Sequence, residues 1–389
     1  MTMKNWPKFA QKNWKWILSF SLFCQLNAHS FELRKTDRAP KNLYQVQSAI
    51  GTLDRKTLEK HLREFIKAAR PNRYIGGAGH LKARDYLEKT ILTLDVLKTG
   101  VFSVQEFTPN TDYAKSFYLD DFNQKVLPHF PPNDPTYKKW QGFTMEMVKE
   151  VQKLASIKGK NFIWEKKGNK NPESVLVFTA NYDSAVMDTK TLKIKPDADG
   201  PGADNNGTGV AMMLTMIELF QAMDFPKTVR FVFLDYGELA YLGAHAYAES
   251  IVKEKKPIGI LNFLMLGHDT KRDKEKRFGN MKVYMRKPDE AGYDEDAALA
   301  DLINNKGAKI ISQVKFTPVS NGFDSYGHTN FWKLGIPSIV FTQDWEDDFN
   351  QARYHTSNDF PETLNLRTFN YSFEYLAGAV ISWAFDINR

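Results

Sequence analysis

The chain has 389 residues, a length that can bury a large core and allows either one large domain or two. Hydrophobic residues make up 42% and charged residues 25%, which are ordinary globular values and exclude a disordered chain. The formal net charge of +7 includes four lysines within the first 28 residues, and removing those four leaves +3, too little to indicate a nucleic-acid-binding protein.

The first 28 residues have the three parts of a secretory signal peptide. Four lysines with no acid among them precede the short apolar run Trp16–Cys24, and the small residue Ala28 offers a cleavage point. The apolar run is shorter than the roughly 20 residues of a transmembrane helix. We therefore expect a signal peptide at 1–28 and an exported bacterial protein, periplasmic or secreted, with no stable membrane span in the mature chain. A buried N-terminal helix is the alternative.

Cys24 is the only cysteine of the chain. Attachment of a lipid to it is an alternative to plain cleavage, but Ser21-Leu22-Phe23 lacks the small residues that precede such a site. After cleavage no cysteine would remain, so neither a disulfide bond nor a catalytic thiol is expected.

The segment 29–51 is polar and shows no clear period, so we expect an extended lead-in. Apolar residues then recur at helical spacing up to Ala69 and predict a helix with Thr52 as its cap. A glycine-rich turn at 76–79 leads into a second predicted helix, Leu81–Leu92. The turn could cradle an anion, but a connecting turn is favoured because no Lys-Ser or Lys-Thr pair follows the glycines.

Strand-like and helix-like stretches follow, interrupted by a segment rich in Asp, Asn and Pro around 108–136 that predicts a surface excursion. The predicted strands are Val101–Phe107, Phe162–Glu165, Val175–Phe178, Val229–Leu234, Gly259–Leu266, Lys282–Arg286, Ile311–Phe316 and Ser338–Phe341. The predicted helices are Met145–Ala155, Ala211–Phe220, Ala240–Lys253, Ala297–Lys306 and Leu366–Phe385. This alternation predicts one α/β domain over 52–389, a three-layer α/β/α sandwich with a mixed, mostly parallel central sheet.

Short polar clusters follow several of the predicted strands, where α/β enzymes place their chemistry. The loop Pro201–Val210 holds one of them and runs directly into a predicted helix. Several such clusters in one domain predict a functional site. The clusters are Asn181-Tyr182-Asp183-Ser184, Asp204-Asn205-Asn206, Asp235-Tyr236-Gly237-Glu238, Gly327-His328 and Tyr354-His355-Thr356.

The order of these motifs resembles that of the zinc aminopeptidases of the aminopeptidase S and bacterial leucyl aminopeptidase type. The stretches that carry the resemblance are GADNNGTGV, FVFLDYGELAYLGAHAY, GHTNFWKLGIPSIVF and YHTSND, and it covers roughly Thr52 to Asn388. It implies the zinc exopeptidase fold, which glutaminyl cyclases, glutamate carboxypeptidase, transferrin receptor and nicastrin share. Working members hold two zinc ions that activate a bridging water, and a glutamate serves as the general base.

The resemblance implies that three of the five metal-ligand positions carry other residue types. Asn181 stands where the family has its first histidine, Asn205 where it has the bridging carboxylate, and Leu264 where it has a metal-binding aspartate. An amide oxygen is a weak, uncharged ligand and leucine offers no lone pair. This pattern indicates a lost di-zinc site.

Glu238 and His355 keep the ligand types of the family, whereas Gly237 occupies the position of the general base. Glutaminyl cyclases use one zinc held by an acid, a glutamate and a histidine, but that set also needs an acid where Asn205 stands. We therefore expect no intact catalytic residue and no cofactor, or zinc if any metal is bound.

Asp183, Asp204 and His328 match residues near the pocket of the family. We interpret them as groups that hold loops in shape, because aspartates hydrogen-bond to nearby backbone and orient neighbouring ligands. A displaced site for one ion, such as calcium, is the alternative. It would draw on Asp183, Asp204, Glu238, His268, Asp269 and His355.

The leading hypothesis is an exported aminopeptidase-like protein that has lost hydrolysis and binds a peptide, an envelope component or a protein partner. The alternative is an active metallo-aminopeptidase with an atypical single-metal site built on Glu238 and His355. A third possibility is a structural role, with the pocket filled by Tyr182, Tyr236 and Tyr241.

Overall fold

The structure is a computed structural model that describes residues 33–254, 256–271 and 278–388. The predicted signal peptide at 1–28 and Cys24 lie outside these residues, so their prediction stands as it was made. No helix among the described residues is long and apolar enough to cross a membrane.

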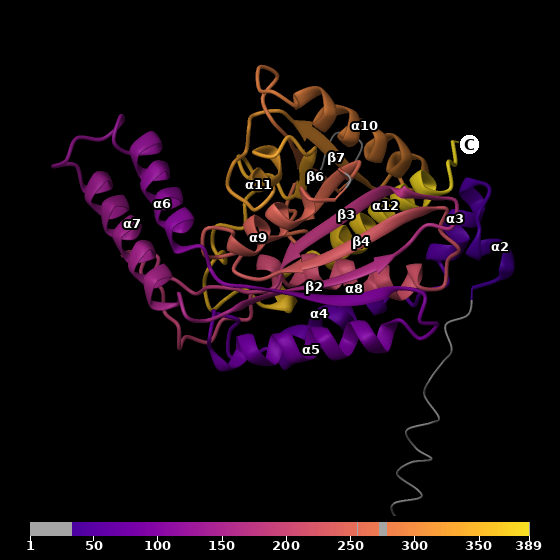
Figure 1. The fold of residues 1–389 in the computed structure, drawn as a ribbon, viewed down its shortest axis with the longest axis horizontal. Helices are drawn as coiled ribbons and strands as arrows, with labels where there is room; N and C mark the ends of the chain where they lie inside the picture. The colour runs from indigo at the N-terminus through magenta and orange to yellow at the C-terminus, as the bar shows by residue number, and fades with distance from the viewer. Residues whose placement is uncertain (1–32, 255, 272–277, 389) are drawn as a thin grey trace, which may run out of the picture.

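One eight-stranded sheet forms the centre of the molecule, in the order β1-β2-β4-β3-β5-β8-β6-β7 (Figure 1). β4, β3, β5 and β8 run parallel to one another and β6 pairs parallel with β7, whereas the pairs β1-β2, β2-β4 and β8-β6 are antiparallel. The predicted mixed sheet is confirmed. The strands are β1 Val101–Phe107, β2 Gly159–Lys166, β3 Asn171–Asn181, β4 Lys227–Leu234, β5 Gly259–Phe263, β6 Phe278–Tyr284, β7 Val314–Val319 and β8 Ser338–Thr342.

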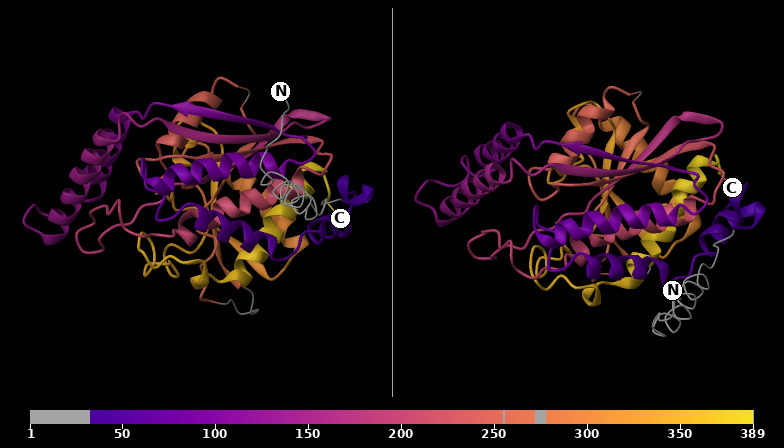
Figure 2. Two further views of the ribbon diagram at one scale, coloured as in Figure 1. Left: turned by 90° about the horizontal axis from the view of Figure 1, so that it is seen from below. Right: turned by 60° about the horizontal axis from the view of Figure 1, so that its bottom comes forward.

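Helices cover both faces of the sheet and make the predicted three layers (Figure 2). α4, α5, α8, α10 and α12 pack on one face, and α9 and α11 on the other. The helices are α2 Lys35–Arg38, α3 Leu43–Ile50, α4 Thr57–Ala68, α5 Ala78–Leu94, α6 Thr111–Lys125, α7 Pro135–Lys153, α8 Thr208–Phe220, α9 Leu242–Ile251, α10 Tyr293–Ile310, α11 Thr329–Trp332 and α12 Leu366–Ala384.

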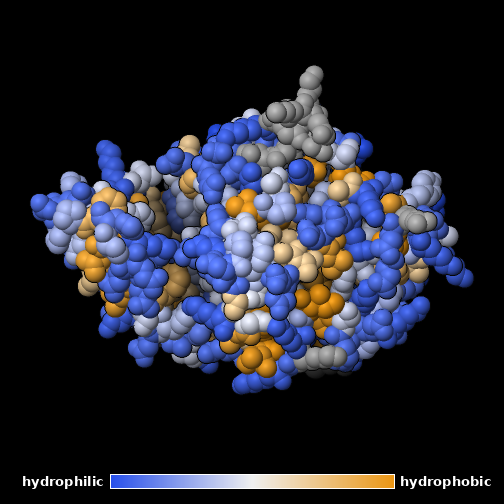
Figure 3. Space-filling view, turned by 90° about the horizontal axis from the view of Figure 1, so that it is seen from above, coloured by the Kyte–Doolittle hydropathy of each residue, from blue (hydrophilic) through white to orange (hydrophobic). Residues whose placement is uncertain are grey.

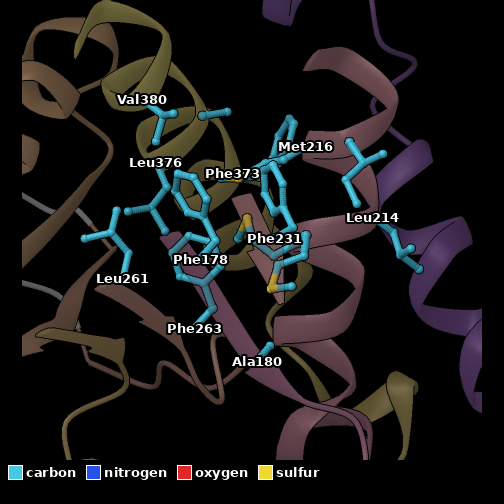
Figure 4. Close-up of a cluster of buried hydrophobic side chains, with 14 of the residues drawn as sticks. Phe178, Ala180, Leu214, Met216, Phe231, Leu261, Phe263, Phe373, Leu376 and Val380 are labelled. Carbon is cyan, nitrogen blue, oxygen red and sulfur yellow. The ribbon is translucent and has the colours of Figure 1, made fainter. Parts of the chain in front are cut away.

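The main core lies between the sheet and α8 and α12 (Figure 4). Side chains of β3 alternate between the faces: Phe178 and Ala180 enter this core, whereas Val177 enters the cluster beneath α9 and α11. α8 is apolar almost all round, and Glu218 is its one residue that is not fully buried. A helix buried on all sides fixes the end of the loop that precedes it.

Two of the predicted features need correction. The segment 29–51 is not extended where the structure describes it: α2 and α3 lie there, and the Asn42 side chain caps α3 by accepting a hydrogen bond from the backbone N–H of Gln45. Val46, Ala49 and Ile50 form a short buried face at helical spacing, which is too brief a signal to stand out from a polar segment. Thr52 does not cap the next helix, which begins at Thr57.

The expected excursion at 108–136 is a helical hairpin, α6 and α7, that projects from the body and reaches to Lys153 (Figure 1). Asn110 caps α6, and Asp134 caps α7 with Pro135 at its first position. These two capping signals mark helix starts within a segment whose composition resembles a loop.

Lys166 at the end of β2 allows a test of the packing between the sheet and the helices. Its side chain is buried, and its Nζ donates to Gln221 O at 2.8 Å and Thr99 Oγ1 at 3.0 Å. Burial lowers the pKa of Lys166 to about 8, from 10.5. At pH values between the folded and the unfolded pKa, the lysine is protonated in the unfolded chain but not in the folded chain. The contribution of Lys166 to the free energy of unfolding therefore rises with pH.

We predict that the free energy of unfolding of the native protein rises by about 1 kcal/mol relative to that of Lys166→Met between pH 7 and pH 9. Urea unfolding followed by circular dichroism at both pH values measures the difference. The other titrating groups are common to both proteins and cancel. If the free energy of unfolding of the native protein minus that of Lys166→Met does not rise between pH 7 and pH 9, the lowered pKa of Lys166 is wrong.

Candidate functional site

The loop before α8 lies at the carboxyl ends of β3, β4 and β5, where the sequence predicts the site. Gly202 has φ of +58°, and a Cβ there would lie 2.7 Å from Asn205 O, so the turn requires glycine. Ala203–Gly207 forms a distorted π-helical turn in which Asn205 and Asn206 leave helical geometry. This turn presents the Asn205 side chain to the neighbouring loops.

Arg73 holds this loop by donating hydrogen bonds to its backbone carbonyls. Its guanidinium is 1% exposed and donates to the carbonyls of Tyr182 at 2.7 Å, Gly202 at 2.9 Å, Asn205 at 3.3 Å and also Pro201. Burial lowers the pKa of Arg73 to about 10, which leaves it charged at neutral pH. One cation thus satisfies several backbone acceptors that would otherwise be buried without a partner.

Asp359 holds the same loop from the other side. Its Oδ1 accepts from Asp204 N at 2.9 Å, and its Oδ2 accepts from Asn205 N at 3.0 Å. Burial raises the pKa of Asp359, while the two amide donors and the charge of Arg73 oppose that shift. The loop is therefore clamped between a buried cation and a buried carboxylate.

Asp183 holds the turn after β4 by accepting hydrogen bonds from its backbone. Its Oδ1 accepts from Gly237 N at 2.7 Å and its Oδ2 from Glu238 N at 2.9 Å. Burial and the neighbouring Glu238 raise the pKa of Asp183 to about 8. The carboxylate faces the backbone, which fits the interpretation of Asp183 as a residue that holds a loop.

The two retained ligand types meet at Glu238. His355 Nε2 lies 2.8 Å from Glu238 Oε2, and Asn205 Nδ2 donates to Glu238 Oε1 at 2.8 Å. The Asn205 amide also has a buried Oδ1 that has no hydrogen-bond partner within the described part of the chain. Asn205, Glu238 and His355 thus form one cluster at the position where the resemblance places a metal centre.

Asn181 and Gly237 are in mutual contact. A Cβ at position 237 would lie 2.4 Å from the Cβ of Asn181, and Asn181 Oδ1 accepts from Asn206 Nδ2 at 3.0 Å. A glutamate at 237 would therefore collide with Asn181 as it stands. The side chain of Asn181, from its Cβ to its amide, occupies the space that a base at 237 would need.

Leu264 lies just beyond β5, which ends at Phe263 and is shorter than predicted. Its side chain is fully buried in an apolar cluster with Met265, Tyr284 and Val340. This position contributes packing and offers nothing to a metal ion.

His328 is buried and does not line the cleft described below. Its Nε2 lies 2.7 Å from Phe323 O, its ring stacks on Phe323, and burial lowers its pKa to about 4. It is neutral at physiological pH and positions the loop 323–328.

The six residues of the displaced-ion alternative do not converge. Asp204 accepts from Gly267 N and Asn350 Nδ2, His268 pairs with Asp348 at 3.3 Å, and Asp269 accepts from Thr368. Within residues 33–254, 256–271 and 278–388 there is no group of three or more His, Cys, Asp or Glu side chains that could hold a metal.

An open cleft of about 480 Å³ leads to Glu238 and His355. α6 and α7 form one wall, and Figure 3 shows the molecule hollowed between the hairpin, at the left, and the body. Aromatic rings dominate the lining and carboxylates outnumber lysines there. The lining includes Phe117, Tyr118, Asp120, Asp121, Lys125, Phe143, Tyr241, Asp324, Tyr326, Lys333 and Tyr354.

The tyrosines expected to fill the pocket do not all do so. Tyr182 and Tyr236 are buried and donate their hydroxyls to Lys160 O and Ile157 O, whereas Tyr241 lines the cleft. The open cleft argues against the purely structural role. A larger hollow of about 800 Å³, among α3, α10 and α12, contains none of the predicted site residues.

The backbone around the cleft is strained. Tyr236, Ala240, Tyr241, Met265 and His355 all have φ between +45° and +55°. Such conformations cost about 1–3 kcal/mol each and persist where the surroundings enforce them, often at functional sites.

Sequence reasoning missed the roles of Arg73, Asp359 and the wall made by α6. Arg73 lies in the stretch RPNRY and Asp359 in YHTSND, but nothing local shows that their side chains bind the loop at 201–205. The hairpin could have been predicted from Asn110 and Asp134, because both are helix-capping residue types at the starts of α6 and α7.

Comparison with known proteins identifies the family. Residues 161–380 match the profile of peptidase family M28, more than half of the chain. The chain therefore belongs to peptidase family M28, and the resemblance to zinc aminopeptidases is confirmed.

Two relatives and one solved structure illustrate the match. A probable zinc metalloprotease of Pyricularia oryzae is 25% identical over 54% of this chain and 46% of its own length, and aminopeptidase YwaD of Bacillus subtilis is 25% identical over 59% and 47%. The chain thus spans about half the length of these curated relatives. The LapA aminopeptidase of Legionella pneumophila has a TM-score of 0.61 at 14% identity, with 89% of this chain and 76% of that chain covered, which shows a shared fold.

We predict that Arg73→Met destabilises the protein by about 3–5 kcal/mol, because it leaves several buried carbonyls and the Asp359 carboxylate without their cation. Chemical unfolding measures the loss. Arg63→Met is the matched control: Arg63 on α4 is 40% exposed and pairs with Glu59 and Glu362, so its loss should cost less than about 1 kcal/mol. Equal effects of the two substitutions would refute the clamp.

Proposed function

We propose that this member of peptidase family M28 has lost metal-dependent hydrolysis and acts by binding a ligand in the cleft beside α6. The ligand is a peptide, a component of the cell envelope or a protein partner. The proposal includes export to the periplasm or medium, which rests on the sequence of residues 1–28 alone.

The state of Glu238 is the observation that carries the proposal. One oxygen of its carboxylate accepts from the Asn205 amide, and the other lies at hydrogen-bond distance from His355. The remaining ligand types thus satisfy one another through direct hydrogen bonds. Asn205 presents an N–H donor to Glu238, where a bridging site would need a second carboxylate.

The other positions of the family's centre support the same conclusion. Leu264 is enclosed by apolar side chains, and Asn181 fills the space beside Gly237. The residues do not fit a pair of divalent ions, because two ligand groups and no base remain for a centre that needs five ligand residues and a base. No reaction step is therefore assigned to zinc.

The cleft retains the properties of a binding site. Its aromatic lining offers apolar contact, and Asp120, Asp121, Asp324 and Glu238 outnumber Lys125 and Lys333. Lys125 is already shared by Asp121 and Asp324. This balance favours a ligand with an apolar body and a positive group.

An atypical single-metal aminopeptidase remains the second candidate. Glu238 and His355 are adjacent, and the orphan Oδ1 of Asn205 is a buried acceptor beside them. Three such groups could surround one ion after small rotations. Metal analysis decides between the two candidates.

We predict that protein purified without added metal carries well below stoichiometric zinc and hydrolyses aminoacyl nitroanilides no faster than a denatured control. Inductively coupled plasma mass spectrometry and the activity assay, run on one preparation, give both numbers. Stoichiometric zinc that is lost together with activity in Glu238→Ala would overturn the proposal in favour of the single-metal enzyme.

A repair variant tests the assignment of positions. We predict that Asn181→His, Asn205→Asp, Gly237→Glu and Leu264→Asp together create zinc binding, which raises the free energy of unfolding by about 3 kcal/mol at zinc concentrations near 100 times the dissociation constant. Without zinc the variant should be less stable than the native protein, since Asn205→Asp sets two carboxylates about 3 Å apart.

The triple variant that retains Leu264 is the matched control and should gain much less from zinc, because one ion lacks its ligand. Thermal unfolding with and without zinc compares the two. Equal zinc responses, or none in the quadruple variant, would show that the assignment of these positions, or the geometry of the pocket, is wrong.

A further inference from the structure

Strand β1 is the edge of the sheet, and one side of it is unpaired. It pairs antiparallel with β2 from Val101 opposite Glu165 to Phe107 opposite Gly159. Among the described residues, the backbone of 101–107 makes hydrogen bonds to β2 alone. In an antiparallel ladder every second residue directs its N–H and C=O away from the partner, so β1 carries a row of free donors and acceptors.

Exposed apolar side chains accompany this free edge. Val96, Leu97, Val101 and Val104 are 71%, 51%, 67% and 36% exposed, all within nine residues of the chain. Val96 and Leu97 precede β1, and Val101 and Val104 lie on it. Exposed apolar side chains beside an unpaired strand are typical of an edge that pairs with another strand.

The strand at the opposite edge of the sheet, β7, is protected against pairing with another strand, unlike β1. β7 carries exposed Lys315 and Pro318, residues that blunt an edge by charge and by a missing N–H. β1 has neither lysine nor proline, and Glu106 is its one charged residue. Figure 2 shows β1 along the outer edge of the sheet.

We propose that β1 is a self-association surface, through which two copies of this chain pair antiparallel about Val104 and continue the sheet. In this register Val104 faces its counterpart, Val101 faces Phe107, and Phe102 faces Glu106. The arrangement buries apolar side chains against one another. The two Glu106 carboxylates lie about 13 Å apart along the ladder, beyond the screening length of physiological salt.

A second copy is the occupant that this edge fits. The strand is complementary to itself, and only one edge of each copy is open, so the pairing closes at a dimer and does not propagate into a fibre. The segment from Leu92 to Phe107 carries a single excess negative charge on a chain with a net charge of +7, which weakens repulsion where the copies meet. This inference is independent of the proposed ligand.

Sedimentation equilibrium of the purified protein tests the pairing. We predict a dimer at micromolar concentrations, and a dissociation constant raised about tenfold or more in both Val104→Lys and Val104→Glu, since each sets like charges face to face at the two-fold axis. Leu334→Lys is the control: Leu334 is 38% exposed, close to the 36% of Val104, but lies away from β1, so this substitution should leave the dimer intact.

Mixing the two Val104 variants makes the test specific. Lysine opposite glutamate should restore a heterodimer with a dissociation constant near that of the native protein, which general loss of stability cannot produce. A native protein that is monomeric throughout, a dimer that both variants retain, or a mixture that stays monomeric would each overturn the proposal.

Discussion

The buried guanidinium of Arg73 is the contact on which the site depends. It binds the carbonyls of the loop at 201–205 and of Tyr182, which lie at the ends of different elements, and so ties the N-terminal helices to the carboxyl edge of the sheet. Asp359 and Asp183 complete this arrangement by binding backbone N–H groups. The buried side chains of Arg73, Asp183 and Asp359 therefore set the shape of these loops through hydrogen bonds to the backbone.

The loop residues on either side of Asn205 bind the backbone rather than the cluster around Glu238. Asp204 accepts from Gly267 N, and the Asn206 side chain binds Phe263 O and Met265 N, so both residues serve the backbone. Asn205 between them is the one whose side chain faces Glu238. A change at 205 alters the site without loosening the loop, whereas a change at 204 or 206 would remove contacts between segments that are about 60 residues apart.

Much of the fold follows from local pattern, and the site follows only in part. β1 occurs where the sequence predicts it. The cores of β3 and β4 coincide with their apolar runs, because a strand buried on both faces leaves a continuous apolar signal. The hairpin was hidden by a composition that resembles a loop. The clamp by Arg73 was hidden for a different reason: its acceptors lie more than 100 residues away and are carbonyl groups, which every residue possesses.

The contact between Asn181 and Gly237 couples the two positions sterically. Asn181 occupies the space that a base at 237 would need, and it is held there by a hydrogen bond from Asn206. Restoring glutamate at 237 alone would collide with Asn181, and restoring histidine at 181 alone would supply a ligand to a site without its bridging acid. The nearest atom is the Cβ of Asn181, which histidine shares, so a glutamate at 237 also needs a shift of the backbone at 181 or 237. The effects of substitutions at these two positions are therefore not additive.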